Sequence, residues 1–317
     1  MRRDVRPVKL DMRAAIVKAI YQVYEDRRKE PHRPHLGGSQ IGNSCSRALW
    51  YQFRWAWREK HEGRILRLFE TGDREEARVI QNLRAAGCTV WERDPDTGMQ
   101  PRFVAHGGHF ALSLDGVIEG LPESSKPHTL EVKTMSEKYF KALSNLGLEK
   151  AKPIYWAQCQ IGMQLSGLER CLFISVNKNT DEIYAERVRH DKAYCQTLLN
   201  KAGGIIFSDK PPSGISSDPA WFECKFCAYH SVCHGDQMPE LNCRTCAFST
   251  PEKSGNWSCA RHKKALDEIE QYTGCGDHIY IPDLVKLPVH DTGEDWVEYV
   301  TEEGEVVRNH KGRMGNG

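Results

Sequence analysis

Two short segments carry acidic side chains at a spacing that could do chemistry. Asp115 lies in the segment 112–118, and Glu131 and Lys133 lie in the segment 130–134. Alternate side chains of a strand share a face, so Glu131 and Lys133 should point the same way. If the two segments pair as strands, Asp115 comes beside Glu131. Two neighbouring carboxylates repel each other unless a proton or a cation lies between them.

A hard divalent ion, Mg²⁺ or Mn²⁺, prefers oxygen ligands and suits such a pair of carboxylates. The ion can polarise a phosphodiester and supply a hydroxide, while Lys133 stabilises charge or positions the water. A surface strand with an incidental Glu-x-Lys pair is the simpler alternative, and the pattern taken alone favours that alternative.

Two helical segments supply further polar side chains. Glu76 lies near the apolar stripe of a helix predicted at 64–85, where an unpaired carboxylate is unfavourable. Gln158 and Gln160 lie on a helix predicted at 153–166. Either glutamine could hold a water or a phosphate in the site, and a satisfied polar cap is the alternative.

Taken in order, Gly-x3-Glu, Leu-Asp-Gly, Glu-Val-Lys and Gln-x-Gln resemble the PD-(D/E)XK nuclease superfamily, in its lambda exonuclease, YqaJ and RecB-like branches. The match runs from about residue 40 to 235. The resemblance implies an α/β restriction-endonuclease-like core, with a mixed sheet flanked by helices. It also implies metal binding by Glu76, Asp115 and Glu131, assistance to the attacking water by Lys133, and support from Gln158 and Gln160. Leu114 stands where the name-giving proline would be.

Three cysteines cluster directly after this region, one short of a tetrahedral or cubane set. An upstream cysteine followed by such a cluster resembles the iron–sulphur exonucleases, including AddB and the CRISPR-associated adaptation nucleases. That resemblance implies a 4Fe–4S cluster bound by Cys45, Cys224, Cys227 and Cys233, which would tie the two ends of the core together. A zinc ion in the same four-thiolate cage is the rival, and spacing does not separate the two.

A second set of cysteines fits a structural zinc site, namely Cys243, Cys246, Cys259 and Cys275. His262 and His278 are nearby substitutes for the last ligands. The opposite assignment, with iron and sulphur here and zinc at the earlier set, remains open. The remaining four of the twelve cysteines fall on apolar faces and are expected in the core: Cys88, Cys159, Cys171 and Cys195.

The charge distribution is uneven although the net charge is only +1. Residues 1–70 hold 16 Lys and Arg against 8 Asp and Glu, and the remainder holds 28 against 35. Such a basic N-terminal segment indicates either a surface that binds a polyanion or a solvated helical face. The segment 46–58 interleaves aromatic and basic residues, a combination that suits nucleic-acid binding. Arg47, Arg54 and Arg58 are therefore predicted to contact DNA, with Trp50, Phe53 and Trp57 mostly in the core.

Hydrophobic periodicity predicts the elements that position these residues. A helix is expected at 10–28, in addition to the two at 64–85 and 153–166. Strands are expected at 89–91, 110–118, 130–134, 171–176 and 182–188, a loop or linker at 203–222, and a hairpin from 296–300 and 305–307. The predicted divisions are an N-terminal helical extension at 1–35, the nuclease core at 36–236, a cysteine-rich module at 237–285, and a hairpin and tail at 286–317.

The function expected from these features is metal-dependent hydrolysis of DNA as an exonuclease, in phage or bacterial recombination, repair or DNA processing. A CRISPR-type nuclease that trims DNA ends, or a non-catalytic DNA-binding module on the same fold, is the alternative. The expected partners are DNA and a single-strand annealing or recombination protein. With 39% hydrophobic residues, no run of about 18 apolar residues and no secretory signal, we expect a cytoplasmic protein without a membrane span.

Overall fold

The computed structural model describes residues 9–27 and 31–316. Its largest sheet has five strands in the order β2-β5-β6-β7-β8. Only β6 and β7 run parallel in this sheet, so the sheet is mixed, as predicted. The strands are β2 Thr89–Trp91, β5 Gly116–Glu119, β6 His128–Met135, β7 Arg170–Asn177 and β8 Ile183–Arg189.

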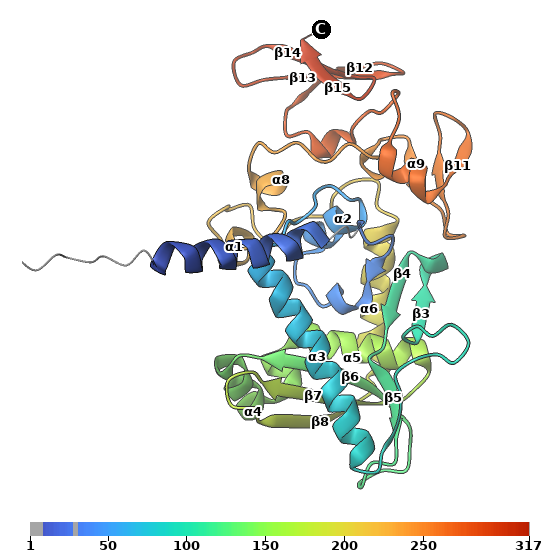
Figure 1. Ribbon diagram of the computed structural model, residues 1–317. Helices are drawn as coiled ribbons and strands as arrows, with labels where there is room; N and C mark the ends of the chain where they lie inside the picture. The colour runs from blue at the N-terminus through green and yellow to red at the C-terminus, as the bar shows by residue number, and fades with distance from the viewer. Residues whose placement is uncertain (1–8, 28–30, 317) are drawn as a thin grey trace, which may run out of the picture.

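Helices cover both faces of this sheet, and Figure 1 shows α3 crossing one of them. α3 (Gly63–Ala85) packs on β2 and β6, whereas α4 (Glu137–Ala151) and α5 (Pro153–Ser166) pack on β6 and β7. The helices predicted at 64–85 and 153–166 are therefore confirmed. The mixed α/β core with flanking helices is confirmed with them.

Strand β7 contacts the helices on both faces of the sheet because its side chains alternate between the faces. Leu172 and Ile174 belong to the apolar cluster that contains Val79 of α3. Phe173 belongs to the cluster that contains Met163 of α5. A strand that is buried on both faces typically has a nearly continuous apolar sequence, as the segment 171–176 does.

The predicted strand at 110–118 is wrong in one respect, because the chain changes sheets in its middle. β4 (Phe110–Ser113) lies in a second sheet between β1 (Leu36–Gly37) and β3 (Arg102–Ala105). β5 then begins at Gly116 in the five-stranded sheet. Asp115 therefore lies where the chain crosses between the two sheets, after the end of β4 and before the start of β5.

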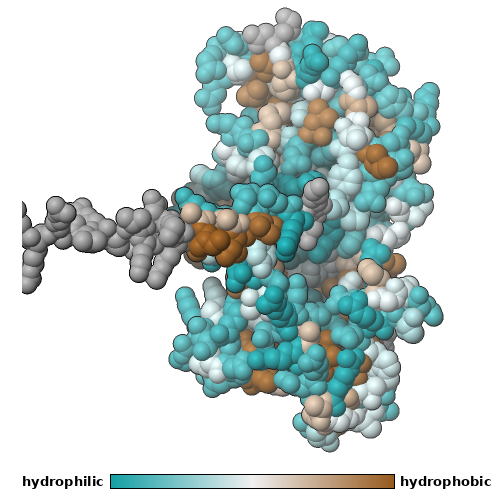
Figure 2. All heavy atoms as spheres, viewed as in Figure 1, coloured by the Kyte–Doolittle hydropathy of each residue, from teal (hydrophilic) through white to brown (hydrophobic). Residues whose placement is uncertain are grey.

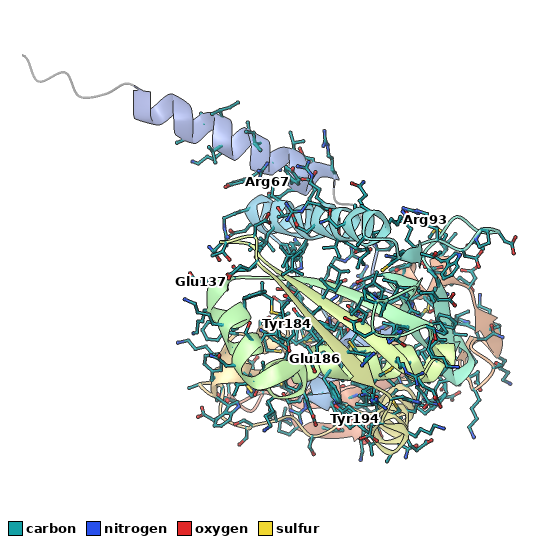
Figure 3. All side chains as sticks on the ribbon, turned by 90° about the horizontal axis from the view of Figure 1, so that it is seen from below. Arg67, Arg93, Glu137, Tyr184, Glu186 and Tyr194 are labelled. Atoms are coloured by element: carbon teal, nitrogen blue, oxygen red, sulfur yellow. The ribbon has the colours of Figure 1, made fainter. Side chains whose placement is uncertain are left out.

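On β8, at the sheet edge, Tyr184 and Glu186 connect the sheet to α4 (Figure 3). The Tyr184 hydroxyl donates to Glu186 Oε2 at 2.5 Å, and the Leu148 amide donates to the same oxygen at 2.8 Å. Leu148 follows Gly147, which has a φ of 74° inside α4. Glu186 thus fixes the kink at Gly147 inside α4.

The segment 203–222 was predicted as a loop, but its first residues are helical. α6 (Lys192–Ile206) includes Gly203 and Gly204, and Asp191 caps its start by accepting from the Tyr194 amide. The buried Ile205 and Ile206 anchor the last turn in the core, which outweighs the poor helix propensity of the glycines. The prediction is corrected for 203–206.

The N-terminal helix α1 (Lys9–Arg27) is confirmed and packs on α3. Gly63 lies so close to the backbone of Tyr21 that a Cβ there would clash at 2.3 Å. Figure 2 shows apolar side chains gathered along α1, among them Ile16 and Ile20, which are exposed. Residues 1–8 and 28–30 of the predicted extension lie outside the described residues.

The cysteine-rich segment 237–285 shares a hydrophobic core with the segment 36–236. Trp50 and Phe53 of α2 (Ser46–Phe53) pack in one cluster with Trp257, Leu266 and Ile281. The segment contains a three-stranded antiparallel sheet and one short helix: β9 Ser249–Pro251, β10 Trp257–Cys259, β11 Lys264–Leu266 and α9 Glu268–Thr273. α7 (Phe222–Lys225) and α8 (His230–His234) precede it.

The predicted C-terminal hairpin is confirmed as part of a four-stranded antiparallel sheet. Its strands are β12 Val289–Thr292, β13 Trp296–Val300, β14 Val306–His310 and β15 Arg313–Asn316. Across residues 9–27 and 31–316, no helix is both long and apolar enough to cross a membrane.

Candidate active site

Asp115 and Glu131 lie side by side, as the strand pattern predicts. β5 and β6 pair with Gly116 opposite Leu130, which places the preceding Asp115 next to Glu131. The Val132 amide donates to Asp115 Oδ2 at 2.7 Å and fixes that carboxylate. Glu131 itself is only 2% exposed. The cluster therefore has one hydrogen-bonded and one buried carboxylate on adjacent strands.

Lys133 lies on the same face of β6 as Glu131, and its ammonium group forms an ion pair with the Glu131 carboxylate. The lysine side chain is partly exposed, and its Nζ lies 5.6 Å from the centre of the Tyr155 ring. The predicted arrangement of these two residues on one face is confirmed. Lys133 can therefore reach both the buried carboxylate and the solvent side of the cluster.

Glu76 comes to the cluster from α3. Gln100, in the loop before β3, donates from Nε2 to Glu76 Oε1 at 3.0 Å. Burial, followed by the charge of Asp115, raises the pKa of Glu76 to about 7. Sequence reasoning missed Gln100, which belongs to no motif and carries no charge that would have marked it.

The acidic cluster has more negative than positive groups, and the pKa values of its members reflect this imbalance. Burial and then the charge of Asp115 raise the pKa of Glu131 to about 8. Burial alone would lower the pKa of Lys133, but the nearby Glu131 and Asp115 outweigh it and raise that pKa, so the ammonium stays protonated. Three carboxylates face one ammonium, and a hard cation would relieve their repulsion.

The donor set fits Mg²⁺ or Mn²⁺, because all three acidic side chains offer only oxygen. As they stand, however, no three of the described His, Cys, Asp and Glu side chains are arranged so that they could hold a metal ion. At the acidic cluster, the Lys133 ammonium supplies the positive charge that Glu131 contacts.

Gln160 has a different role from the predicted one. Its Nε2 donates to the Arg189 carbonyl at 2.8 Å, and its Oε1 accepts from the Asp191 amide at 2.8 Å. Both ends of the amide are thus used to join β8 to α6, and this prediction is corrected. Gln158 is buried on the same helix, and no hydrogen bond joins it to the three carboxylates within the described residues.

The first set of cysteines comes together around one small cavity of about 20 Å³, lined by Cys45, Cys224, Cys227 and Cys233. Cys45 immediately precedes α2, whereas the other three lie around α7 and α8. His230 and His234 line the same cavity. Cys45 therefore lines the same cavity as the three downstream cysteines, and a cluster bound by the four stays a prediction.

The second set lines a larger cavity of about 490 Å³, with Cys243, Cys246, Cys259 and Cys275 joined by His262 and His278. His262 Nε2 lies 3.6 Å from Cys275 Sγ. His278 is buried and hydrogen-bonds Thr245, and burial lowers its pKa to about 4. Burial and the neighbouring thiols, Cys246 first, raise the pKa of Cys243 to about 12.

Arg54 does not face a ligand, which corrects its predicted role in DNA binding. The side chain is 2% exposed and donates to the carbonyls of Ser208 at 2.9 Å and Ser249 at 3.1 Å. Its guanidinium lies over Trp50 and Trp257, so it is a buried linker between segments. Arg58 is exposed.

Arg47 is half-buried beside the first cysteine set. Its Nε donates to the Pro212 carbonyl at 2.8 Å, and its Nη1 lies 3.8 Å from Cys233 Sγ. Trp57, expected in the core, lies after the end of α2 and is only partly buried.

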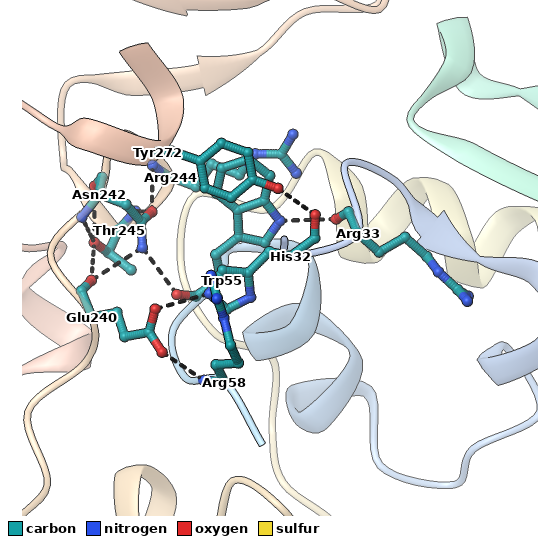
Figure 4. A network of polar contacts seen from close by, with 9 residues as sticks. All are labelled: His32, Arg33, Trp55, Arg58, Glu240, Asn242, Arg244, Thr245 and Tyr272. Atoms are coloured by element: carbon teal, nitrogen blue, oxygen red, sulfur yellow. Dashed lines mark hydrogen bonds and ion pairs between the residues drawn. The ribbon is translucent and has the colours of Figure 1, made fainter. Parts of the chain in front are cut away.

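A buried aromatic stack joins the N-terminal and cysteine-rich segments (Figure 4). The Trp55 ring stacks with those of His32 and Tyr272, with ring centres 5.5 Å and 4.2 Å away, and His32 and Tyr272 also stack on each other. The Arg244 guanidinium lies 3.7 Å from the Trp55 ring centre. Sequence reasoning missed Arg244, because an arginine between two cysteines carries no distinguishing pattern.

No protein-family model matches the chain, and no curated protein matches it. Among solved structures, it is similar to LHK-Exo, an alkaline exonuclease from Laribacter hongkongensis, with 15% identity, a TM-score of 0.38, and coverage of 58% of this chain and 90% of that one. The LHK-Exo complex with dAMP gives 15% identity, a TM-score of 0.37 and coverage of 59% and 89%. SSO0001 gives 14% identity, a TM-score of 0.40 and coverage of 72% and 98%.

Proposed function

We propose that this protein is a metal-dependent deoxyribonuclease that hydrolyses phosphodiester bonds as an exonuclease. The observation that carries the proposal is the convergence of Asp115, Glu131 and Lys133, with Glu76 held beside them by Gln100. A cluster of buried carboxylates with raised pKa values is unfavourable for stability alone and is typical of a functional site.

Each residue has a distinct part in the proposed reaction. Asp115 and Glu131 would hold a divalent ion, with Glu76 as the third carboxylate. Bound there, Mg²⁺ or Mn²⁺ would polarise the phosphodiester and lower the pKa of a water. Lys133, which stays protonated, would donate to the attacking water or stabilise the charge that develops on the phosphate. Gln100 would keep Glu76 oriented.

The two cysteine sets are proposed to bind metals that hold the fold together. We assign a 4Fe–4S cluster to Cys45, Cys224, Cys227 and Cys233, and zinc to Cys243, Cys246, Cys259 and Cys275. Support comes from the cavity that each set shares, and histidines line both cavities. Four thiolates suit either metal, so the reverse assignment is the alternative.

Cleavage of end-labelled linear DNA by the purified protein tests the proposed activity. With Mg²⁺, mononucleotides or short fragments should appear from the ends, and EDTA should stop the reaction. A covalently closed circular DNA should stay intact, because an exonuclease needs an end. Cutting of the circle would indicate an endonuclease, and binding without cleavage would indicate the non-catalytic alternative.

We place the activity in recombination, repair or phage DNA processing, where DNA ends are the substrate. A single-strand annealing or recombination protein would then be the partner that receives the product strand. A CRISPR-type role would instead show as trimming of short duplexes to a defined length, which the same labelled substrates would reveal.

A further inference from the structure

Three arginines without an acidic partner surround His35. Arg102 Nη2 lies 3.3 Å from His35 Nδ1, and Arg244 Nη2 donates to the Pro34 carbonyl at 2.9 Å. Arg33 is two residues away in the chain, with its side chain extending away from the aromatic stack (Figure 4). Within residues 9–27 and 31–316, none of the three arginines forms an ion pair with a carboxylate.

His35, Arg102 and Arg244 line an open cleft of about 210 Å³ between the β3–β4 turn and the cysteine-rich segment. The turn approaches that segment closely, because a Cβ on Gly255 would lie 1.9 Å from the Gly107 carbonyl oxygen. Both glycines have positive φ, so no other residue fits this contact without strain. The cleft lining carries one carboxylate, Glu268, against Arg102, Arg244 and two histidines, His35 and His109.

Arg244 is a rigid, buried charge at the base of this cleft. Its Nε donates to Gln271 Oε1 at 2.9 Å and its Nη1 donates to the Phe53 carbonyl at 3.1 Å. The same guanidinium lies 3.7 Å from the ring centre of Trp55 and 4.6 Å from that of Trp257. A buried charge without a counter-ion is unfavourable unless an anion binds nearby.

His35 adds no positive charge of its own at neutral pH. Burial, followed by the charges of Arg102 and Arg33, lowers its pKa to about 4. The neutral ring can accept a hydrogen bond from Arg102 and so orient that guanidinium toward the cleft. The excess positive charge therefore resides on the arginines, which are the side chains that best match phosphate geometry.

The cleft lies along the strand that leads to the acidic cluster. Arg102 pairs with Ser113, two residues before Asp115, and Gln100, two residues before Arg102, donates to Glu76. Two residues of a strand span roughly 7 Å, so Arg102 in the cleft lies close to the carboxylates of the acidic cluster.

We propose that the cleft lined by His35, Arg102 and Arg244 binds a backbone phosphate of the nucleic-acid strand that enters the acidic cluster, with Arg102 as a positioning residue. This inference rests on the proposed nuclease function and names a substrate contact for it. Arg102 is the residue to test because it is exposed on a strand, so its replacement leaves the buried Arg244 network intact.

The test is the affinity for a fluorescently labelled oligonucleotide duplex, measured by anisotropy in EDTA between about 50 and 200 mM salt. Arg102→Gln should weaken binding and reduce the slope of log affinity against log salt by about one unit. Arg102→Lys, which keeps the charge, should retain most of the slope. Arg187→Gln, a matched change on the exposed face of β8, should behave as wild type. In steady-state cleavage, Arg102→Gln should raise KM with kcat little changed.

If Arg102→Gln has the wild-type affinity and salt slope, the cleft does not bind a backbone phosphate, and the nuclease proposal is unaffected. Failure of the wild-type protein both to bind and to cleave DNA would overturn both proposals together. A second experiment measures whether inorganic phosphate raises the melting temperature of the protein. Thermal stabilisation by phosphate that disappears in Arg102→Gln, with DNA binding unchanged, would show a free-anion site and would also overturn the nucleic-acid assignment.

Discussion

The Val132 amide donates to Asp115 across the gap between β5 and β6, and this one contact joins the two halves of the acidic cluster. Val132 lies between Glu131 and Lys133, so the same backbone segment that presents these two side chains also fixes the facing carboxylate. The strand pairing therefore sets the distance between Asp115 and Glu131. Side-chain flexibility contributes little to it.

Replacing Gln100 with Ala should weaken Mg²⁺ binding. The Gln100 amide holds Glu76, and a hydrogen bond to a charged group contributes about 1.5 kcal/mol, equivalent to roughly tenfold in affinity. Titration calorimetry of Mg²⁺ against the DNA-free protein measures the effect. Gln196→Ala, an exposed glutamine on α6, is the control. Unchanged affinity in Gln100→Ala would remove Glu76 from the proposed metal site.

Metal affinity should rise with pH between about 6 and 9. A carboxylate must lose its proton to bind a cation, and the pKa values of Glu76 and Glu131 are about 7 and about 8 in the metal-free protein. At pH 6 the proton competes with the metal at both groups, and at pH 9 it competes at neither. Glu76→Gln should remove the lower step of the titration. A flat profile across this range would contradict the described electrostatics.

Arg54→Met should lower stability without changing DNA affinity. The side chain donates to buried carbonyls of Ser208 and Ser249, and their loss should cost about 2 kcal/mol. Urea unfolding measures the free-energy change, and Arg58→Met, at an exposed position, should leave it near wild type. Loss of DNA binding in a folded Arg54→Met protein would restore the role that the sequence pattern suggested.

Protein purified without oxygen should be brown and should contain zinc. Charge transfer from sulphur to iron colours a 4Fe–4S cluster, whereas d¹⁰ zinc is colourless. Cys224→Ser should remove the colour and keep the zinc, and Cys246→Ser should do the reverse. A colourless protein with two zinc ions would replace iron with zinc at the first set, and the opposite response of the two variants would exchange the assignments.

The strand periodicity was enough to predict the neighbourhood of Asp115, Glu131 and Lys133, because alternation on a strand is a local property. The prediction of one strand at 110–118 overlooks Asp115-Gly116, which interrupts the apolar residues where the chain changes sheets. The division follows from strand pairing, because β4 pairs with β1 and β3 whereas β5 pairs with β2 and β6.

The prediction for Arg54 is wrong for a local reason. Trp50, Phe53 and Trp57 share a helical face only if the helix continues to residue 57, but α2 ends at Phe53 and Trp55 has a φ of 54°. The chain therefore turns, and Arg54 enters the core with it. Gln160 failed because the helix presents it to the β8–α6 connection, a tertiary contact that its spacing from Gln158 does not encode.

The most direct test of the central claim is the Mg²⁺-dependent rate of DNA hydrolysis by Asp115→Asn, compared with wild type and Glu119→Gln. Asparagine can still accept from the Val132 amide, so the fold should be kept while one anionic ligand is lost. Glu119 lies on the same strand, β5, outside the cluster and provides the matched loss of a carboxylate. We expect a fall of at least about 1,000-fold for Asp115→Asn, equivalent to about 4 kcal/mol, and a near wild-type rate for Glu119→Gln. A wild-type rate from folded Asp115→Asn would contradict the account.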